Sequence, residues 1–257
     1  MTTPPPSPIA VIPARLGSER LPRKVLLAET GTPLIVHVCR ATARSSVGRV
    51  IVAADDAEIV YAVETAGFEA MLTSPDHANG TSRVAEVAQR LGLADDAVVV
   101  NVQGDEPEIE PAVIDAAVAA VTRSDAQVAT VASPFGDDED PADPNLVKAV
   151  LDQTGHALLF TRALAPHDRD GLGGVQRYRH VGLYVYRASL LARISGLTPT
   201  PLERAERLEQ LRFLEHGYRI AVAVHSSPRS GIDTPEQYRA FVERYRTICG
   251  AESRGTL

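Results

Sequence analysis

The amino-acid sequence predicts an α/β fold with a mostly parallel central sheet, helices on both faces, and an antiparallel extension in the second half. Apolar or β-branched runs alternate with helical patterns through residues 9–123, which is typical of β-α-β units with right-handed crossovers. The run at 9–12 is apolar throughout and the run at 97–102 nearly so, as strands of a buried sheet are. In the second half two runs flank a short turn, Asp152 to Gly155, which favours an antiparallel pair.

The first half alternates strands and helices regularly. Strands are expected at 9–12, 49–54, 68–72 and 97–102, and helices at 33–46, 57–66, 83–91 and 111–123. Asp55 and Asp56 stand where a helix start belongs, and Gly67 closes the helix that follows them. The polar segment at 73–82 contains proline and glycine and is predicted to be a loop.

The second half is less regular. Strands are expected at 128–131, 147–151, 157–161, 180–186 and 219–224, and helices at 190–194 and 202–216. An aspartate-rich loop at 135–144 and a glycine-containing connection at 166–176 lie between them. The last helix is expected to begin at Asp233-Thr234-Pro235-Glu236, because a capping residue and a proline mark its first turn.

No internal repeat and no clear linker divides the chain. Residues 9–249 are therefore predicted to form a single domain. The proline-rich segment at 1–8 is expected to be a disordered lead-in, and residues 250–257 a tail.

Composition limits the possible classes of function. The formal net charge of the 257 residues is −7, which argues against general binding to nucleic acid or to a membrane surface. No apolar run approaches the roughly 18 residues of a membrane span, and residues 1–8 lack the features of a signal peptide. Cys39 and Cys249 form no motif and fit a reduced compartment, so a cytoplasmic protein is expected.

A loop rich in cations follows the first buried strand. Open α/β sheets bind ligands at the carboxyl ends of their strands, where cations, amides and a hydroxyl together suit a polyanion such as a triphosphate. Only two of the 26 Lys and Arg residues are lysines, and Lys24 in this loop is one of them. A solvated loop with scattered arginines is the alternative. The residues of interest beyond Pro13 are Arg15, Gly17, Ser18, Arg20, Arg23 and Lys24.

Two aspartates have the setting of metal ligands. Asp105 follows the most apolar strand, beyond Gly104, and Asp233 follows Gly231 and Ile232. Their carboxylates together suit one Mg²⁺ ion, which usually keeps several waters and takes further ligands from substrate phosphates. Each aspartate could instead cap the helix after it.

Other polar residues have both a functional and a structural interpretation. Glu209 and Gln210 lie beside a leucine stripe, where a surface ion pair between Glu209 and Arg212 is the structural alternative. His180 precedes a strand and is either a ligand or a histidine satisfied within the fold.

The loop at 73–82 has its own candidates. His77 and Asn79 either contact the edge of a base or only form turns. Elsewhere the sequence has no nucleophile elbow, no Walker lysine motif, no cysteine-rich metal motif and no dinucleotide-binding glycine fingerprint.

Five motifs together resemble one enzyme family, 3-deoxy-manno-octulosonate cytidylyltransferase (CMP-Kdo synthetase). The first of them is similar to the signature of sugar-nucleotide cytidylyltransferases in general, and the resemblance spans about residues 9–246. The motifs are Ile12-Pro13-Ala14-Arg15 with Ser18, Arg20, Leu21-Pro22 and Lys24; Asn101 to Pro107; His180 to Tyr184; Leu208 to Arg212; and Gly231 to Pro235.

The resemblance implies a Rossmann-like nucleotidyltransferase fold, a homodimer, and Mg²⁺ as cofactor. The implied reaction transfers CMP from CTP to a hydroxyl of 3-deoxy-manno-octulosonate (Kdo), a step of lipopolysaccharide biosynthesis, and releases pyrophosphate. Residues 9–123 would be the CTP-binding half, and residues 124–249 the half for acceptor binding and dimerisation.

The resemblance also implies residue roles. The catalytic residues would be Arg20, Lys24, Asp105 and Asp233, of which Asp105 and Asp233 hold the metal. The nucleotide would contact Ala14, Arg15, Arg20, Lys24, Thr73, His77, Asn79, Gly80 and Gln103. The small acidic acceptor would contact Arg83, Gln103, His180, Tyr184, Glu209 and Gln210.

Three positions depart from the family's usual pattern. Ser82 stands where an acidic residue is usual, and Arg23 and Val185 stand where glycine is usual. The first two changes make the site more positive. A related cytidylyltransferase of a natural-product pathway, which activates another small acid such as a phosphonate, is therefore the alternative.

Two further classes fit the residues less well. A non-catalytic nucleotide-binding relative would not need Lys24, Asp105 and Asp233 together. A sugar-1-phosphate nucleotidyltransferase would not need the polar set around His180 and Glu209, which suits a polyhydroxylated acid.

Overall fold

The computed structural model describes residues 7–18, 20–171, 173–227 and 231–252. Most of the expected lead-in and tail, residues 1–6 and 253–257, lie outside the described residues. Within the described part of the chain, no helix combines the length and the apolar character needed to cross a membrane.

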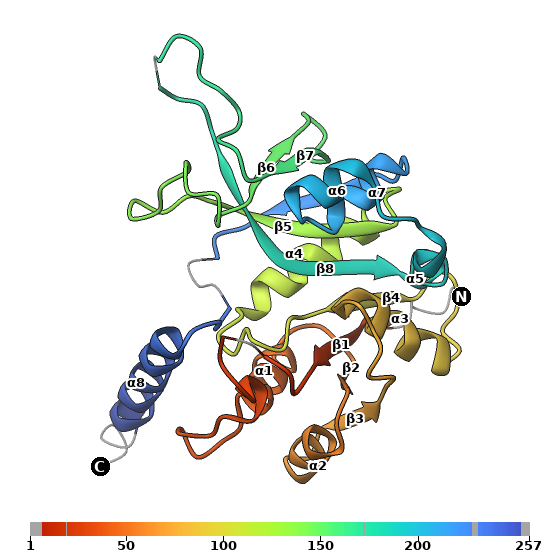
Figure 1. Cartoon of the computed structure of the whole chain (residues 1–257), viewed down its shortest axis with the longest axis vertical. Coiled ribbons are helices and arrows are strands. Elements are labelled where there is room, and N and C mark those ends of the chain that lie inside the picture. Colours follow the sequence, from red (N-terminus) through yellow and green to blue (C-terminus); the bar gives the residue numbers. More distant parts are fainter. Residues whose placement is uncertain (1–6, 19, 172, 228–230, 253–257) are drawn as a thin grey trace, which may run out of the picture.

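A nine-stranded mixed sheet forms the centre of the molecule, and the predicted α/β class is confirmed (Figure 1). The strand order is β3-β2-β1-β4-β8-β5-β9, with β6 and β7 attached beside β8. The strands are β1 Ile9–Ala14, β2 Arg49–Ala54, β3 Glu69–Leu72, β4 Val98–Asn101, β5 Val128–Pro134, β6 Lys148–Leu151, β7 Ala157–Thr161, β8 Tyr178–Arg187 and β9 Ile220–Val224.

The first four strands are parallel, with β1 between β2 and β4. Their carboxyl ends therefore meet at one edge of the sheet, where Ala14 pairs with Ala54 and where β4 ends at Asn101. The cation-rich loop, the polar loop after β3 and the segment around Asp105 all leave the sheet at this edge.

The antiparallel extension is built on β8, which lies between β4 and β5 and runs antiparallel to both. The β6–β7 hairpin around the predicted turn pairs with β8 through β6, while β9 runs parallel to β5. Tyr184 lies opposite Asn101 across the β4–β8 ladder. A Cβ atom at Gly182 would lie 3.9 Å from Cγ of Gln103, so β8 passes close to the loop that follows β4.

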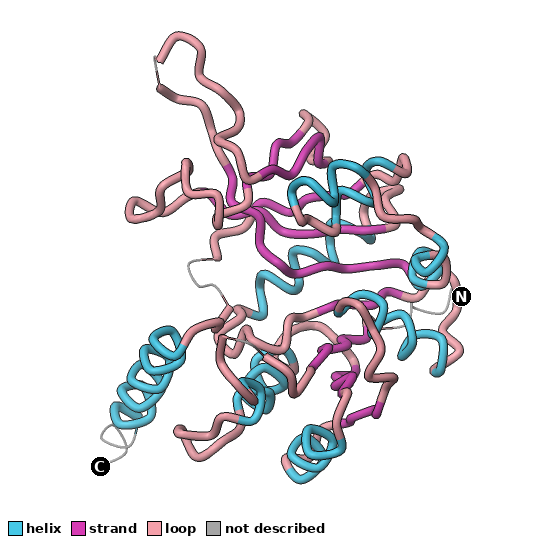
Figure 2. The backbone as a smooth tube through the Cα atoms, viewed as in Figure 1, coloured by secondary structure: helices cyan, strands magenta, loops and turns pink. Residues whose placement is uncertain are grey.

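Helices cover both faces of the sheet (Figure 2). Neighbouring residues of β1 face opposite ways: Ile12 packs with residues of α1, α2 and α4, whereas Val11 packs with residues of α3, α5 and α7. Burial of both faces explains why β1, β2 and β4 are almost entirely apolar. The helices are α1 Leu34–Thr42, α2 Ala57–Thr65, α3 Gly80–Arg90, α4 Pro111–Thr122, α5 Ala188–Leu191, α6 Pro201–Glu206, α7 Gln210–Glu215 and α8 Pro235–Glu252, with 3₁₀ turns η1 Lys24–Leu26 and η2 Ile194–Gly196.

The prediction of one helix over 202–216 was wrong. Arg207 adopts a left-handed conformation, with φ 53°, and separates α6 from α7. A capping box between Thr200 and Glu203 begins α6 at Pro201, one residue earlier than expected. Leu208 and Leu211 are nonetheless both buried, so the leucine spacing indicated a buried face and not a continuous helix. The helix expected at 190–194 is likewise shorter and earlier, as α5.

The loop predicted at 73–82 is also shorter than expected. Oδ1 of Asn79 accepts a hydrogen bond of 2.8 Å from the N–H of Ser82 and caps α3, which therefore begins at Gly80. Residues 80–82 consequently belong to a helix whose first turn faces the edge of the sheet described above.

The last helix, α8, packs against α1 and the loop after β1. Ile232, Phe241 and Val242 are buried in a cluster with Leu21 and Leu34. The imidazole of His37 on α1 lies edge-on to the rings of Phe241 and Tyr245, at 5.2 and 4.7 Å between ring centroids. This packing fixes the position of the segment around Asp233, immediately before α8.

Candidate active site

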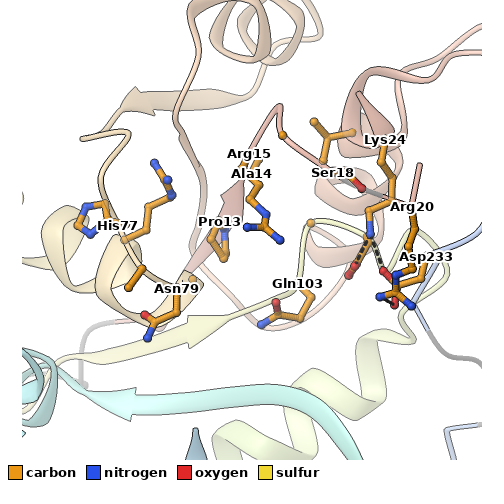
Figure 3. Close-up of a pocket in the computed structure, with 17 residues that line it drawn as sticks. Pro13, Ala14, Arg15, Ser18, Arg20, Lys24, His77, Asn79, Gln103 and Asp233 are labelled. Carbon is orange, nitrogen blue, oxygen red and sulfur yellow. Dashed lines mark hydrogen bonds and ion pairs between the residues drawn. The ribbon is translucent and has the colours of Figure 1, made fainter. Parts of the chain in front are cut away.

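A cavity of about 520 Å³ opens at the carboxyl ends of the parallel strands. In Figure 3, His77 and Asn79 lie at one end of the labelled set, and Arg20, Lys24 and Asp233 lie at the other. Its lining residues are Pro13, Ala14, Arg15, Gly17, Ser18, Arg20, Lys24, Val25, His77, Ala78, Asn79, Gly80, Arg83, Gln103, Gly104, Asp105 and Asp233.

The cation-rich loop forms the wall after β1. The N–H of Leu16 donates a hydrogen bond of 2.9 Å to Oδ1 of Asp55 at the end of β2. Arg15 is exposed at the cavity, and the chain then returns through η1, which places Lys24 under the loop. The side chain of Lys24 is buried, in contrast to that of Arg20, which is 67% exposed.

Arg23 does not take part in the cavity. Its backbone is left-handed, with φ 54°, and its guanidinium forms an ion pair with Glu58 on α2. A left-handed residue favours glycine, which explains why glycine is usual at this position in the family the motifs resemble. The extra charge that the sequence suggested near a phosphate is therefore directed elsewhere.

Lys24 joins the two predicted metal ligands. Its Nζ atom lies 2.7 Å from Oδ2 of Asp105 and 3.0 Å from Oδ1 of Asp233 (Figure 3). The guanidinium of Arg20 lies 2.9 Å from Oδ2 of Asp233. Neither aspartate caps a helix: α4 begins at Pro111 after Glu110, and the hydroxyl of Thr234 accepts the N–H of Gln237 in α8.

These two carboxylates fit a magnesium ion. Both reach the same point in space, and both supply the oxygen ligands that Mg²⁺ prefers. No group of three or more His, Cys, Asp or Glu side chains in the described ranges is arranged to hold a metal. A site of this kind would need water or phosphate oxygens to complete the coordination of the ion, which is the usual situation for Mg²⁺.

The opposite end of the cavity is formed by the segment before α3. His77 is held there by two partners, because its Nδ1 lies 3.1 Å from Oγ of Ser82 and its Nε2 contacts the carboxylate of Glu86. Asn79 uses its carbonyl oxygen to cap α3, which leaves its amide nitrogen for other contacts. Ser82 thus takes part in holding His77, and Glu86 supplies a carboxylate one helical turn further on.

Arg83 lines the cavity from a buried position. Its NH1 atom donates to Oγ1 of Thr73 at 2.5 Å and to the carbonyl of Ser74 at 2.9 Å. Burial lowers the pKa of Arg83, and the nearby carboxylates of Asp55 and Glu86 oppose that effect. Thr73 does not line the cavity, and its hydroxyl donates to the carbonyl of Ala54. Its contribution is to hold Arg83.

The expected acceptor-binding residues fall into two groups. Arg83 and Gln103 line the cavity, whereas His180 and Tyr184 lie on the neighbouring strand β8. Nε2 of His180 lies 2.9 Å from Oγ1 of Thr130, and its ring packs against Phe160, with 4.9 Å between centroids. Burial lowers the pKa of His180 to about 3, so the imidazole is neutral.

Glu209 and Gln210 lie at the start of α7, away from the described cavity. Glu209 forms a side-chain hydrogen bond with Thr81 of α3, and burial raises its pKa. Arg212 does not form the ion pair with Glu209 that the sequence offered as an alternative; it pairs with Glu203. Gln210 is buried, and its Nε2 has no hydrogen-bond partner among the described residues. An unsatisfied buried amide of this kind is consistent with a ligand-binding role.

Several residues at the site were not expected from the sequence. Thr81 links Glu209 to Tyr186, and Asp55 holds the loop after β1. Burial, together with the negative charge of Asp105, raises the pKa of Glu106 to about 8. A polar residue directly after an apolar strand was the available signal for Asp55, but a helix cap explains that pattern equally well.

Residues 9–220 match the family model described as cytidylyltransferase. The 3-deoxy-manno-octulosonate cytidylyltransferase of Acidovorax ebreus (strain TPSY) is 48% identical over 256 residues, which cover 93% of this chain and 96% of the relative. This chain belongs to the 3-deoxy-manno-octulosonate cytidylyltransferase family. The enzyme of that name from Halorhodospira halophila (strain DSM 244 / SL1) is 45% identical, over 92% of this chain and 96% of the relative.

Solved structures agree with this membership. A CMP:2-keto-3-deoxy-manno-octonic acid synthetase in complex with CTP superposes with a TM-score of 0.86 at 35% identity, over 96% of this chain and 99% of that one. An inositol-1-phosphate CTP transferase from T. maritima superposes with a TM-score of 0.62 at 12% identity, which indicates a shared fold only. The expected nucleotidyltransferase fold is thereby confirmed, as is the resemblance carried by the five motifs of the 3-deoxy-manno-octulosonate cytidylyltransferase family.

Proposed function

We propose that this protein transfers CMP from CTP to a hydroxyl of Kdo, giving CMP-Kdo and pyrophosphate. The observation that carries the proposal is the meeting of Lys24, Asp105 and Asp233 at one end of a cavity that is also lined by Arg15, Arg20 and Arg83. Relatives that are 45–48% identical bear the name of this activity. The 35% identical structure described as a complex with CTP supports the choice of nucleotide.

The cavity suggests how CTP lies. We assign the triphosphate to the part of the cavity between Arg15, in the middle of the labelled set in Figure 3, and Arg20 and Lys24 at its end, because three cations line this part. The cytosine is assigned to the end near His77 and Asn79, where an unused side-chain amide is available for hydrogen bonds. Both nitrogens of His77 already have partners, so we expect this residue to shape the base pocket without donating to the base.

The acceptor is assigned to the space between Gln103 and β8. Gly182 lies at the boundary of that space, since a Cβ atom at this position would be in van der Waals contact with Gln103 and Glu106 at 3.9 Å. His180 and Tyr184 are linked to Glu209 by ring contacts with Tyr186 and by the hydrogen bonds of Thr81. We place these residues and the neighbouring Gln210 behind that space. Arg83 lies where it can bind the carboxylate of an acid.

Mg²⁺ is proposed as the cofactor, held by Asp105 and Asp233. When bound, the ion would withdraw charge from phosphate oxygens and favour ionisation of a nearby hydroxyl. The ammonium of Lys24 occupies the position between the two carboxylates, so it would have to move aside for both aspartates to hold an ion. The guanidinium of Arg20, which now pairs with Asp233, could likewise bind a phosphate instead.

The reaction needs no covalent enzyme intermediate. The acceptor oxygen forms a bond to the α-phosphorus in line with the bond that breaks to pyrophosphate, and the hydroxyl proton passes to solvent. Positioning and charge neutralisation supply most of the catalysis in such transfers. In this chain, Arg15, Arg20 and Lys24 would offset the charge that develops on pyrophosphate.

A pyrophosphate-release assay with CTP, Mg²⁺ and Kdo tests the proposal. Turnover with Kdo is expected, and a panel of other small acids, including phosphonates, should give rates at least about tenfold lower, because each lost polar contact in a built site is costly. Turnover with another acid but none with Kdo would overturn the acceptor assignment and leave the reaction class standing. CTP binding without turnover on any acid would favour a regulatory relative.

A homodimer formed through the second half is proposed as well. Strand β7 pairs with β6 alone among the named strands, and Leu158 on β7 is 63% exposed. Leu164 and Leu202 are also exposed, and apolar side chains beside an open strand edge are typical of an interface. Light scattering should give twice the chain mass, and Leu158→Asp should shift the protein toward a monomer. A monomeric wild type would contradict the proposal.

We also place the reaction in the cytoplasm. The cysteine whose side chain is described, Cys39, is an unpaired thiol and is buried, which fits a reducing compartment. Fractionation of the producing cells is the corresponding test, and recovery of the protein with an exported fraction would contradict this placement.

A further inference from the structure

Asp55 lies just behind the wall of the cavity and does not line it. It is the first residue after β2, and its backbone N–H donates a hydrogen bond of 3.2 Å to the carbonyl of Ala14 at the end of β1. In return, its side-chain Oδ1 accepts the N–H of Leu16 at 2.9 Å. This one residue therefore binds the chain on both sides of Arg15.

This double contact fixes the start of the cation-rich loop. The side chain of Leu16 packs against the main apolar cluster, while its N–H is held by Asp55. With both ends of Leu16 anchored, Arg15 before it and Gly17 and Ser18 after it are presented to the cavity. If the carboxylate were removed, the N–H of Leu16 would lose its partner, and the loop would lose the contact that selects this conformation.

The charge of Asp55 also acts on the cavity. The negative charge of Asp55 raises the pKa of Arg83, and the positive charge of Arg15 lowers it. The carboxylate thus offsets repulsion between two arginines that line the same space. For a triphosphate, however, an additional negative charge nearby is unfavourable, so the two effects of Asp55 on CTP binding have opposite signs.

We infer that Asp55 is a positioning residue for CTP, which acts through its hydrogen bond to the N–H of Leu16. The inference rests on the proposed use of CTP. Asparagine at position 55 keeps an acceptor oxygen of the same reach and removes the charge, whereas alanine removes both. The neighbouring Asp56 offers a matched control, because its carboxylate accepts the N–H of Glu58 and caps α2, away from the cavity.

The test is calorimetric titration of CTP in the presence of Mg²⁺ and without acceptor, so that no turnover occurs. Asp55→Ala should raise the Kd for CTP by about 10- to 100-fold, the range expected for one hydrogen bond to a charged group. Asp55→Asn should stay within about threefold of the wild type, since the acceptor oxygen is retained. Asp56→Ala should lower the Tm but leave the Kd unchanged within the same limit.

Two results would overturn the inference. The first is wild-type affinity in Asp55→Ala. The second is a loss of CTP affinity in Asp55→Asn equal to that in Asp55→Ala, which would assign the effect to charge and not to the hydrogen bond. The asparagine variant remains informative if the alanine variant does not fold. The proposed function is judged separately, by CTP binding and pyrophosphate release in the wild type, so the two failures are distinguishable.

Discussion

Nζ of Lys24 lies 2.7 Å from Oδ2 of Asp105, and with Asp233 it forms a compact group of one cation and two anions. A buried ammonium requires such partners, and two neighbouring carboxylates require a positive charge between them. The three side chains therefore form one unit. Removing Lys24 would leave the carboxylate of Asp105 without this partner, whereas Asp233 would keep its ion pair with Arg20.

Replacing this ammonium should abolish most of the activity. Lys24→Met is expected to lower kcat with Kdo by about 100- to 1000-fold, because a preorganised charge next to the triphosphate is lost. Steady-state pyrophosphate release provides the measurement. The adjacent Arg23→Ala is the matched control, since Arg23 pairs with Glu58 and does not line the cavity. Equal losses in both variants would argue against a specific role for Lys24.

The two aspartates should determine the need for metal. Asp105→Asn and Asp233→Asn are each expected to raise the Mg²⁺ concentration for half-maximal rate by about 10- to 100-fold, because a charged oxygen ligand is lost. Addition of a chelator to the wild type should stop pyrophosphate release, and excess Mg²⁺ should restore it. Mn²⁺ binding to the CTP complex, followed by electron paramagnetic resonance, separates binding from turnover. Glu110→Gln, at an exposed position before α4, is the control.

Gly104 should be required where the loop after β4 passes the end of β1. A Cβ atom at this position would lie 2.8 Å from the carbonyl oxygen of Pro13, a backbone atom that cannot turn aside. Gly104→Ala is expected to lower the free energy of unfolding by about 1–3 kcal/mol and to reduce kcat by displacing the adjacent Asp105. Denaturant titration and the pyrophosphate assay measure the two effects. Gly196→Ala, with open space around the new methyl group, should be tolerated.

Acidification should weaken the docking of α8. Burial lowers the pKa of His37 to about 4, compared with an ordinary value of 6.5. The unfolded chain therefore binds a proton more readily, so the stabilising effect of neutral His37 is complete above pH 6.5 and is lost as the pH falls toward 4. The free energy of unfolding should decrease over this window.

Substitution at position 37 checks the assignment. His37→Phe keeps an aromatic ring against Phe241 and Tyr245 and removes the titrating group. Its unfolding free energy should depend less on pH between 6.5 and 4 than that of the wild type, although His180 continues to contribute in the same direction. An unchanged slope would show that His37 is not responsible.

Much of the fold was accessible from the sequence. The parallel strands are buried on both faces and so form continuous apolar runs, which locate β1, β2 and β4 closely. Helix bounds were less accessible where one residue decides them. The left-handed Arg207 breaks the helix expected over 202–216, and nothing in its side chain marks that conformation in the sequence.

The candidate site was accessible to the extent that its residues follow strands. Arg15, Lys24 and Asp105 lie after β1 and β4 at the common edge of the sheet, so their meeting follows from topology. The sequence did not reveal which side chains would contact one another. It did not reveal that Thr73, expected at the nucleotide, accepts a hydrogen bond from Arg83, or that Asp55, expected near a helix start, holds the loop after β1.

The scarcity of lysine has a practical consequence for chemical modification. Lys148 is fully buried, with Nζ donating to the carbonyls of Asp143 and Arg162 at 2.9 and 2.6 Å, and Lys24 is 9% exposed at the cavity. Apart from the α-amino group, the folded chain therefore offers an amine-reactive reagent only the ammonium between Asp105 and Asp233. Slow acylation of that amine, followed by mass spectrometry, would report whether the cavity is occupied. Coupling to a surface through lysine would capture the protein by its nucleotide site.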